Sequence, residues 1–428
     1  MQRQKPRQST GILMHPLMRP LMHPLIAALA AAASGGAWAD EPNPYYIGVT
    51  QSLTHDSNVY RLPDGSGDNF ASTGLVGGFD QSIGRQRIHA TANVRDNYYQ
   101  REKTLNNISY GVSAGWDLVT IENLSGGVTL DANQSLASYD NNNAARPTTN
   151  RNIIKTQQLA ARVLWGGVGA FNLDGAYSHS RVSYSETPIA ESSQDSASFG
   201  GSYRIGPTLR LGAGLRLSRA VSPNGFQTAP GVFTASTTDG RNLDFSADWR
   251  PSVQTGLNAR LSWTRQTNSG NGDRDFSGLT GGLSASYAPT SKLSFSASLS
   301  RDAGTNSSFF NLANQNAGKP VTGLSENSQT SDSLSLGAAY AATAKIGVTA
   351  GLQYRRSKVS DQTVVGNVVV ANDHDDSTRS ASIGANYAIA RNWSLACNLA
   401  YVSRDVSGRL PYSYNANTVS CSAQFLLR

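Results

Sequence analysis

The chain has 428 residues, a formal net charge of +7 and a pI near 9.4. Only 15% of its residues are charged, well below the roughly one quarter of average soluble domains, so it is not an average soluble protein. Aromatic and aliphatic residues recur along the whole sequence, which excludes a disordered chain. Removal of residues 1–39 would take away four basic residues and no acid, and the net charge would fall from +7 to +3. The pI therefore gives no reason to expect nucleic-acid binding.

The N-terminal segment, residues 1–39, has the pattern of a secretory signal peptide. A basic start is followed by an apolar run at 25–33 and by Ala37-Trp38-Ala39, an A-x-A cleavage pattern. The apolar run is too short to cross a bilayer as a helix, which needs about 20 residues. Translation could begin at any of the methionines that precede it, which are Met1, Met14, Met18 and Met22. We expect residues 40–428 to form the exported protein as a single domain.

From residue 45 onward the sequence alternates apolar and small polar residues over stretches of about ten. Across residues 209–217, Leu or Ala occupies every odd position, and Arg or Gly occupies every even one. A period of two predicts β-strands, and no segment keeps a helical period. The pattern predicts 18 strands, over residues 45–54, 70–82, 87–98, 106–118, 122–136, 153–165, 170–183, 195–205, 208–219, 241–250, 253–265, 275–288, 292–302, 331–342, 345–358, 377–389, 393–404 and 414–427.

The breaks between these strands alternate between short turns and long polar loops, such as 137–152, 220–240, 303–330 and 359–376. This alternation is typical of outer-membrane barrels, which have short periplasmic turns and long external loops. Proline cannot donate a ladder hydrogen bond, and the prolines beyond residue 39 are expected in breaks or before the first strand. The predicted fold class is all-β, a transmembrane antiparallel up-and-down β-barrel of about 18 strands. We expect it in the bacterial outer membrane, with membrane lipid and the barrel-assembly machinery as partners.

Aromatic residues predict where the membrane surfaces lie. Trp116, Trp165, Trp249 and Trp393 fall beside short turns, whereas Trp263 falls towards a long loop. Tyrosines join both groups: Tyr203, Tyr287, Tyr340 and Tyr387 the first, and Tyr98, Tyr177, Tyr184, Tyr354 and Tyr401 the second. Two such bands are expected where amphipathic rings meet the two headgroup layers.

The small polar face of each strand is expected to line the barrel interior. Ionised groups are costly against lipid, so charged residues on this face imply a lumen filled by water or by a plug. A barrel of 16–18 strands leaves an aqueous channel. Such a lining could favour anionic or polar solutes, or its Arg and Asp residues could merely neutralise one another across strands. The pore-lining candidates are Arg95, Arg162, Arg204, Arg210, Arg216, Asp244, Asp248, Arg260 and Arg355, and His89, Asp117, Asp131, Asp174 and Arg250 share their face.

The two cysteines, Cys397 and Cys421, fall in the last two predicted strands, both on the lipid-facing side. A hairpin centred near Arg409 would place them opposite each other. In the oxidising periplasm this predicts a cross-strand disulfide, with two free thiols as the alternative.

Few sequence patterns point to catalysis. The chain contains no His-Glu-x-x-His or Cys-x-x-Cys pattern, and the acidic run around His374 matches no defined calcium loop. Its single Gly-x-Ser-x-Gly match, residues 111–115 (GVSAG), falls inside a predicted strand and not at a strand-to-helix turn. We therefore predict that the protein is not an enzyme and that it binds no metal and no cofactor.

Two segments and one pair carry a family resemblance. Residues 54–61 (THDSNVYR), residues 419–425 (VSCSAQF) and the pair Arg404-Asp405 resemble the EpsL-like outer-membrane β-barrel proteins of extracellular polysaccharide clusters. This resemblance implies a role in export or assembly of an exopolysaccharide, with other export-cluster proteins as partners. It implies no catalytic residue.

The leading functional prediction is thus an outer-membrane barrel that acts as a passive conduit for an exopolysaccharide. The first alternative is a general diffusion porin for small polar or anionic solutes. The second is a structural or adhesive surface barrel, in which the external loops matter and the lumen does not.

Overall fold

The computed structural model describes residues 43–120, 123–139, 149–166, 169–186, 191–229, 232–269, 275–303, 328–359, 362–365, 368–371, 374–407 and 413–427. The chain divides into two units, Met1–Asn43 and Pro44–Arg428, and every described strand belongs to the second. The predicted signal peptide, residues 1–39, lies outside the described residues. Among the described residues, no helix is long and apolar enough to span a membrane.

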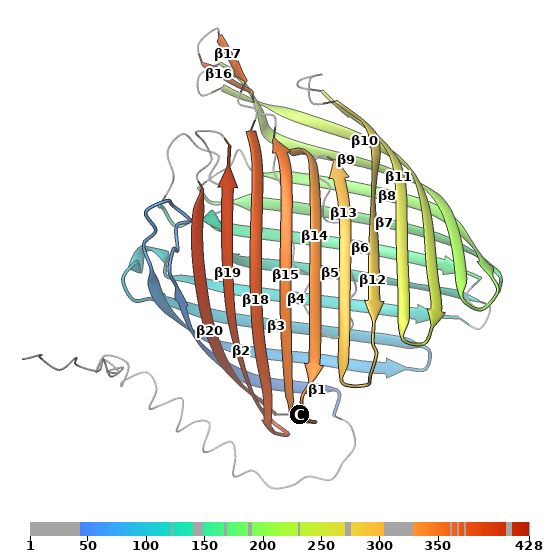
Figure 1. Ribbon diagram of the computed structural model, residues 1–428, viewed down its shortest axis with the longest axis horizontal. Helices are drawn as coiled ribbons and strands as arrows, with labels where there is room; N and C mark the ends of the chain where they lie inside the picture. The colour runs from blue at the N-terminus through green and yellow to red at the C-terminus, as the bar shows by residue number, and fades with distance from the viewer. Residues whose placement is uncertain are drawn as a thin grey trace, which may run out of the picture. The chain divides into compact units, whose positions relative to one another are not determined.

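The second unit consists of long antiparallel strands, each of which runs against its neighbour (Figure 1). The first ten are β1 Tyr45–Asp56, β2 Asp68–Ile83, β3 Gln86–Tyr99, β4 Asn107–Val119, β5 Leu124–Leu136, β6 Ile153–Trp165, β7 Phe171–Tyr184, β8 Ser192–Ile205, β9 Leu209–Ala229 and β10 Val232–Ser252. The others are β11 Thr255–Asn268, β12 Phe276–Tyr287, β13 Leu293–Ala303, β14 Ser328–Ala341, β15 Ile346–Val359, β16 Gln362–Val365, β17 Val368–Ala371, β18 His374–Ala390, β19 Trp393–Val406 and β20 Tyr414–Leu427. One turn of 3-10 helix, η2 Lys103–Leu105, lies between β3 and β4.

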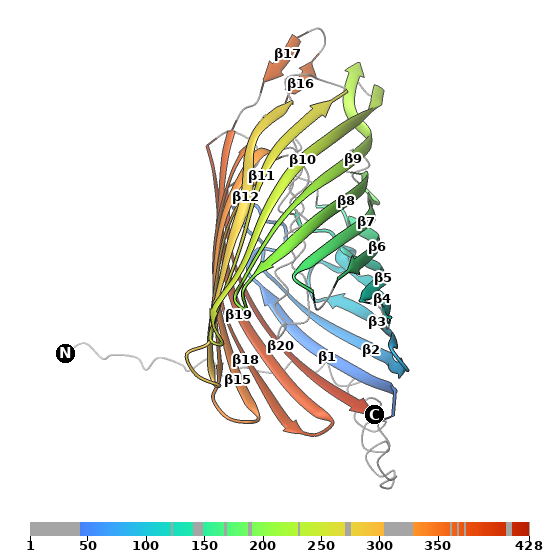
Figure 2. The ribbon, with the colours of Figure 1, turned by 90° about the vertical axis from the view of Figure 1, so that its right-hand side faces the viewer.

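The main sheet closes on itself. Its first strand, β1, pairs with β2 on one side and with the last strand, β20, on the other, so that Ile47 lies opposite Leu427 and Asp56 opposite Thr418. Figure 2 shows β1 and β20 side by side. This sheet contains 18 strands, and β16 and β17 form a separate hairpin in the connection between β15 and β18. The predicted up-and-down barrel of 18 strands is confirmed.

Two of the short turns depend on glycine. Gly84 between β2 and β3 has φ of +62°, and Gly206 between β8 and β9 has φ of +66°. The backbone twist of tight hairpin turns matches the twist of the flanking strands only when φ is positive, a conformation that is costly for residues with a Cβ. These turns therefore fix the register of their hairpins.

The prediction of a long loop at 220–240 is wrong. β9 continues to Ala229 and β10 begins at Val232, so the two strands run on as a hairpin past the point where the apolar alternation ends. Hydrogen bonding between the strands does not require an apolar face, so the ladder continues where lipid no longer contacts it. The hydrophobic pattern ends at the edge of the lipid rather than at the end of the strand.

The expectation that prolines stay out of strands also fails at two positions, because Pro223 lies within β9 and Pro251 within β10. The pairing register shifts between Thr234 and Ser236, opposite Pro223, and again between Trp249 and Ser252. Both prolines therefore occupy irregularities where the ladder is already interrupted, which is the place where a strand tolerates proline.

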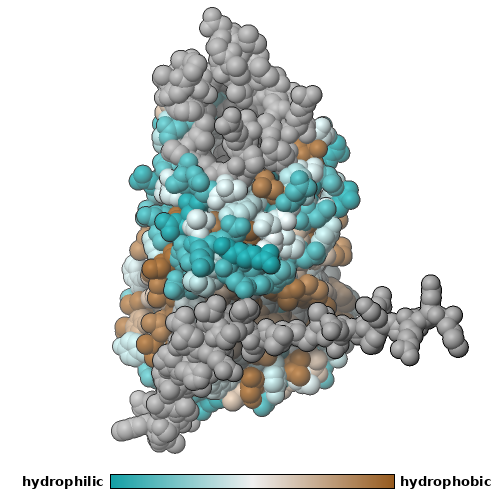
Figure 3. Space-filling view, turned by 90° about the vertical axis from the view of Figure 1, so that its left-hand side faces the viewer, coloured by the Kyte–Doolittle hydropathy of each residue, from teal (hydrophilic) through white to brown (hydrophobic). Residues whose placement is uncertain are grey.

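Large apolar side chains cover the outer face of the barrel and are exposed, for example Leu215 at 60%, Leu243 at 42% and Trp263 at 57%. Soluble monomers rarely expose more than a few hundred Å² of continuous apolar surface, whereas lipid stabilises such a belt around a closed barrel. Figure 3 shows apolar residues gathered low on one face, with hydrophilic residues above them. The protein is an outer-membrane β-barrel.

The exposed aromatic residues follow the predicted grouping with one exception. The group beside the short turns includes Trp116, Trp165, Tyr203, Trp249, Tyr287, Tyr340 and Tyr387, and the group towards the longer loops includes Tyr98, Tyr177, Trp263, Tyr354 and Tyr401. Trp393 also lies beside a short turn with outward parity, but it is only partly exposed. Tyr184 does not belong to the second group: it lies seven residues from Tyr177 in β7, so its side chain points to the opposite face.

Candidate pore lining

Burial distinguishes the two faces of each strand. In β11, Leu261 and Trp263 are 53% and 57% exposed, whereas Ser262 and Thr264 between them are 0% and 3% exposed. Side chains crowd one another on the concave side of a closed sheet, so the buried small polar residues mark the interior. All nine predicted lining residues lie on this face, each between two residues that point outward.

Charged residues form a row along the interior wall of β9, β10, β11 and β13. Arg216 in β9 donates from Nε to Oδ2 of Asp244 in β10, over 3.0 Å, and a second guanidinium nitrogen donates to Oδ1 over 3.1 Å. The hydroxyl of Ser262 in β11 also donates to Asp244. Arg260 in β11 lies 3.9 Å from the carboxylate of Asp302 in β13. Basic and acidic groups thus alternate across neighbouring strands.

The same row continues through β14, β15, β18 and β19. Arg355 in β15 donates from Nε to the hydroxyl of Ser331 in β14 over 2.9 Å. Arg404 in β19 donates through two nitrogens to Oδ2 of Asp376 in β18, over 3.0 and 2.6 Å. We call the seven charged residues Arg216, Asp244, Arg260, Asp302, Arg355, Asp376 and Arg404 the interior charge row.

Sequence reasoning missed Asp302 and Asp376 as members of this row. Both occupy the small polar parity of their strands, two residues from Ser300 and from Thr378 respectively, so the alternation contained the signal. The predicted strand begins at residue 377, so Asp376 falls in a predicted loop. Arg404 was noted only for the family resemblance.

The interior charge row is crowded. In one ion pair, the side chain of Arg216 is 13% exposed and that of Asp244 is 20% exposed. In another, the side chain of Arg404 is 9% exposed and that of Asp376 is 15% exposed. Nearer the short turns the wall is open: Arg162, three residues from Trp165, is 75% exposed, and so is Arg250 beside Trp249. The side chains of the wall are therefore more closely packed along the interior charge row than beside the short turns.

Several predicted lining residues form ion pairs, as the neutralisation alternative expected. Arg162 lies 3.2 Å from Asp117, and Arg250 lies 3.5 Å from Asp248. Arg204 and Arg210, in contrast, oppose each other directly across β8 and β9. The wall therefore carries both neutral pairs and excess positive charge.

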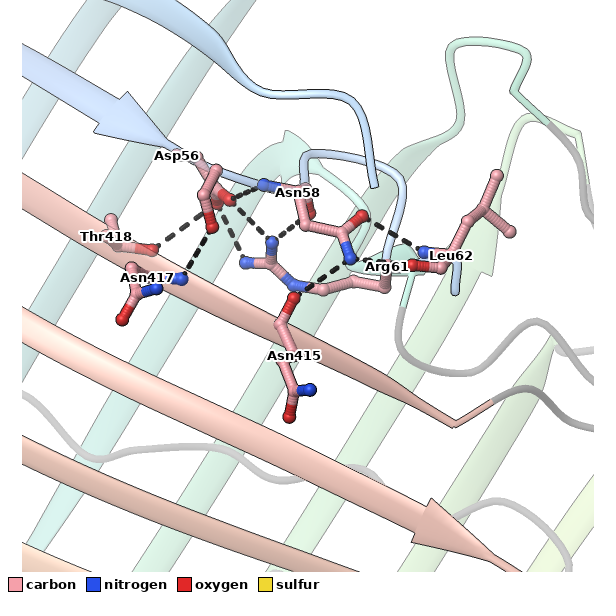
Figure 4. Close-up of polar contacts among 8 residues, drawn as sticks. Asp56, Asn58, Arg61, Leu62, Asn415, Asn417 and Thr418 are labelled. Atoms are coloured by element: carbon pink, nitrogen blue, oxygen red, sulfur yellow. Dashed lines mark hydrogen bonds and ion pairs between the residues drawn. The ribbon is translucent and has the colours of Figure 1, made fainter. Parts of the chain in front are cut away.

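The segment 54–61, singled out for its family resemblance, locks the seam between the first and last strands (Figure 4). Arg61 donates to both carboxylate oxygens of Asp56, over 2.7 and 2.8 Å, and the backbone N–H of Asn58 donates to Asp56 over 2.9 Å. The buried side chain of Asn58 donates to the carbonyls of Leu62 and of Asn415 in β20. This network holds the connection between β1 and β2 against the end of β20.

A small apolar cluster holds three of the long-loop connections together. Tyr60, Leu105 and Tyr139 are buried, and the rings of Tyr60 and Tyr139 lie 5.2 Å apart at 73°. Tyr60 donates to Glu102 over 2.9 Å; burial, with this carboxylate as a second cause, raises the pKa of Tyr60. Burial also raises the pKa of Tyr139 to about 12. This end of β1 to β5 thus has a rigid, packed rim.

An open pocket of about 360 Å³ lies at the same end. Its lining is mainly polar and consists of Ser57, Asn58, Pro63, Gly65, Arg404, Asp405, Ser413, Tyr414 and Asn415. Because Arg404 also belongs to the interior charge row, the pocket brings polar groups of the rim next to charged groups of the wall. Within the described part of the chain, no three His, Cys, Asp or Glu side chains come together as metal ligands.

Cys397 and Cys421 lie directly opposite each other in β19 and β20, with Cα atoms 4.1 Å apart and the sulfurs bonded. Both residues share the outward parity of Leu395 and Leu399. The disulfide would therefore face the membrane and take no part in the pore.

Comparison with known proteins gives structural neighbours and no sequence family. No family model matches the chain, and no curated protein matches it. Among solved structures, it is similar to the outer-membrane protein OpdK of Pseudomonas aeruginosa, at 12% identity and a TM-score of 0.48 over 90% of this chain and 99% of that one. It is also similar to OpdO of the same organism, at 14% identity and a TM-score of 0.48 over 90% and 97%. A third similar structure is the siderophore receptor PirA of Acinetobacter baumannii, at 7% identity and a TM-score of 0.43 over 91% and 81%.

The prediction of an exopolysaccharide conduit is wrong. The similar structures are OpdK, which was also crystallised with vanillate, OpdO and siderophore receptors, and none of those named is a polysaccharide exporter. Nothing in the comparisons supports the EpsL-like resemblance beyond the barrel architecture.

Proposed function

We propose that this barrel is a passive channel for small polar solutes, including anionic ones. The observation that carries the proposal is the interior charge row, which presents four arginines and three aspartates on neighbouring strands of one wall. Planar guanidinium groups bind carboxylates and phosphates through paired hydrogen bonds, and carboxylates accept hydrogen bonds from hydroxyl or ammonium groups. A small polar solute could therefore exchange its hydration for successive contacts along the wall.

The uneven exposure of the wall supports a narrow region rather than an unrestricted pore. Arg204 and Arg210, which oppose each other beside a short turn, would attract anions, and the closely packed interior charge row would then discriminate among solutes by size and polarity. A passive channel needs no catalytic group and no bound cofactor. Insertion by the barrel-assembly machinery remains part of this proposal.

Single-channel recording in planar bilayers tests the proposal. We expect steady openings whose reversal potential in a salt gradient lies on the anion side. Replacement of Arg216, Arg260 and Arg355 by Gln should move the reversal potential towards cations. Arg162→Gln, which alters an exposed residue near a short turn, is the matched control and should move it little. A folded barrel that never opens would refute the channel and leave the surface-protein alternative.

A further inference from the structure

Two arginines oppose each other directly on the outer face of the barrel. Arg241 in β10 pairs with Arg265 in β11, one row beyond the pair formed by Leu243 and Trp263. Both arginines are exposed and share the outward parity of these two apolar residues. We call Arg241 and Arg265 the outer arginine pair.

The position of the pair along the strands places it at the external membrane surface. Arg241 precedes Trp249, a member of the aromatic band beside the short turns, by eight residues of β10. At about 3.3 Å per residue this is about 26 Å of strand, or about 20 Å along the barrel axis for a tilt near 40°. The apolar band of such barrels is about 25 Å tall. Long arginine side chains at this level reach the external headgroup layer.

No acidic group in the described residues satisfies the outer arginine pair. Neither the Arg241 nor the Arg265 side chain forms a hydrogen bond or a close ion pair with another described residue, although Arg241 interacts electrostatically with Asp239 at longer range. Asp239 lies on the same face of β10, but Arg219 engages both of its carboxylate oxygens, over 2.8 and 3.2 Å. Like charges directly opposite each other destabilise a strand pair, so an anion bound between the two guanidinium groups would stabilise it.

Two other outward arginines near the same level have acidic partners, whereas Arg181 and Arg379 have none among the described residues. Arg356 in β15 lies 2.9 Å from Asp375 in β18, and Arg301 in β13 lies 3.8 Å from Asp332 in β14. Arg356 follows Tyr354 by two residues, just as Arg265 follows Trp263, so it serves as a matched control. The outer arginine pair is distinguished by the direct opposition of two like charges.

We propose that the outer arginine pair binds the phosphoryl group of an anionic lipid in the external leaflet. Two guanidinium groups on adjacent strands can donate several hydrogen bonds to one phosphate, and each is held by the ladder beneath it. Leu243 and Trp263, 42% and 57% exposed, lie directly below and would contact the acyl chains and the headgroup boundary. A lipid therefore satisfies both parts of the site, whereas a free phosphate satisfies only the charged part.

The test uses the full chain, purified in a neutral detergent, with lipid A and dephosphorylated lipid A as probes. Native mass spectrometry would count the lipids bound to wild-type protein, to the double variant Arg241→Gln/Arg265→Gln and to the control Arg356→Gln. We expect the double variant to bind lipid A about tenfold more weakly, the scale of one lost charge-assisted hydrogen bond. The control should bind within about twofold of wild type, since its arginine is already paired. Folding of every variant is checked by resistance to unfolding in cold detergent gels.

Three results would overturn the proposal. The first is equal binding of lipid A by the double variant and wild type. The second is equal binding of phosphorylated and dephosphorylated lipid by wild type, which would assign the interaction to acyl chains alone. The third is displacement of lipid A by inorganic phosphate at comparable concentration, which would make the pair a free-anion site. Channel conductance is not involved, so failure of the proposed function would leave this result unaffected.

Discussion

Neutralisation of one acid in the interior charge row should change ion selectivity by a calculable amount. Asp244 lies 3.0 Å from Arg216 and is 20% exposed, so Asp244→Asn removes a negative charge from the narrow part of the wall without a large change in volume. A monovalent ion that passes about 5 Å away interacts with that charge by about 0.8 kcal/mol in water. Screening at 0.1 M salt, where the Debye length is about 10 Å, lowers this to about 0.5 kcal/mol.

The two ions of a salt respond in opposite directions. Loss of the carboxylate should favour passage of an anion by roughly twofold and disfavour a cation by the same factor, so the anion-to-cation permeability ratio should rise about fivefold. The assay is the reversal potential of reconstituted single channels across a potassium chloride gradient. Asp248→Asn is the matched control, because Asp248 is on the same face of β10 but 41% exposed near a short turn, and it should change the ratio by less than about twofold.

An unchanged ratio for Asp244→Asn would refute the reasoning, since it would mean that permeant ions do not pass the interior charge row. Equal shifts for Asp244→Asn and Asp248→Asn would also contradict it, because selectivity would then arise from the whole lumen rather than from the narrow region.

Three further predictions concern stability and covalent structure. Non-reduced peptide mapping of purified protein should recover Cys397 and Cys421 as one linked peptide pair, and recovery of both as free thiols would contradict the disulfide. Asp56→Asn should lower the thermal midpoint of the folded barrel and its free energy of unfolding by about 3 kcal/mol, because Arg61, only 17% exposed, loses its bidentate partner. Arg87→Gln, which breaks an exposed ion pair, is the control and should lower the free energy of unfolding by less than about 1 kcal/mol. In the folded state the pKa of Tyr139 is raised to about 12, so this group contributes stability that is present below pH 10 and is lost as the pH rises from about 10 to 12. Tyr139→Phe should remove that part of the pH dependence of the thermal midpoint.

Strand number and direction could be predicted from the sequence because lipid imposes a strict alternation on every membrane-crossing strand. Leu209 to Leu217 shows the reason: each outward residue must be apolar and each inward one need not be, so parity is visible in the letters. The extension of β9 and β10 beyond residue 220 could not be seen, because water on both faces removes that constraint while hydrogen bonding between the strands persists. Sequence periodicity therefore indicates where a strand contacts lipid, and it does not indicate where hydrogen bonding between the strands ends.

The lining residues could be predicted from parity, but their partners could not. Parity places Arg216 and Asp244 on the same face, yet their contact depends on the register between β9 and β10. In that register Arg216 lies opposite Asn242, and Asp244, two residues further along β10, is its diagonal neighbour. Nor does parity tell a crowded wall from an open one, so the difference between Arg216 and the exposed Arg162 becomes visible only in three dimensions. The hydrogen bonds between the β1–β2 connection and β20 could not be predicted either, since Asn58 and Asn415 are 357 residues apart in sequence.

Vesicle swelling with a graded series of solutes tests the central claim most directly. Liposomes that contain the purified barrel would be diluted into isotonic solutions of small carboxylates, monosaccharides and oligosaccharides, and the fall in turbidity would give relative rates of entry. The account predicts rapid entry of the small carboxylates, slower entry of neutral monosaccharides and no measurable entry of oligosaccharides. Entry of oligosaccharides as fast as monosaccharides, or no entry of any solute through a folded barrel, would contradict it.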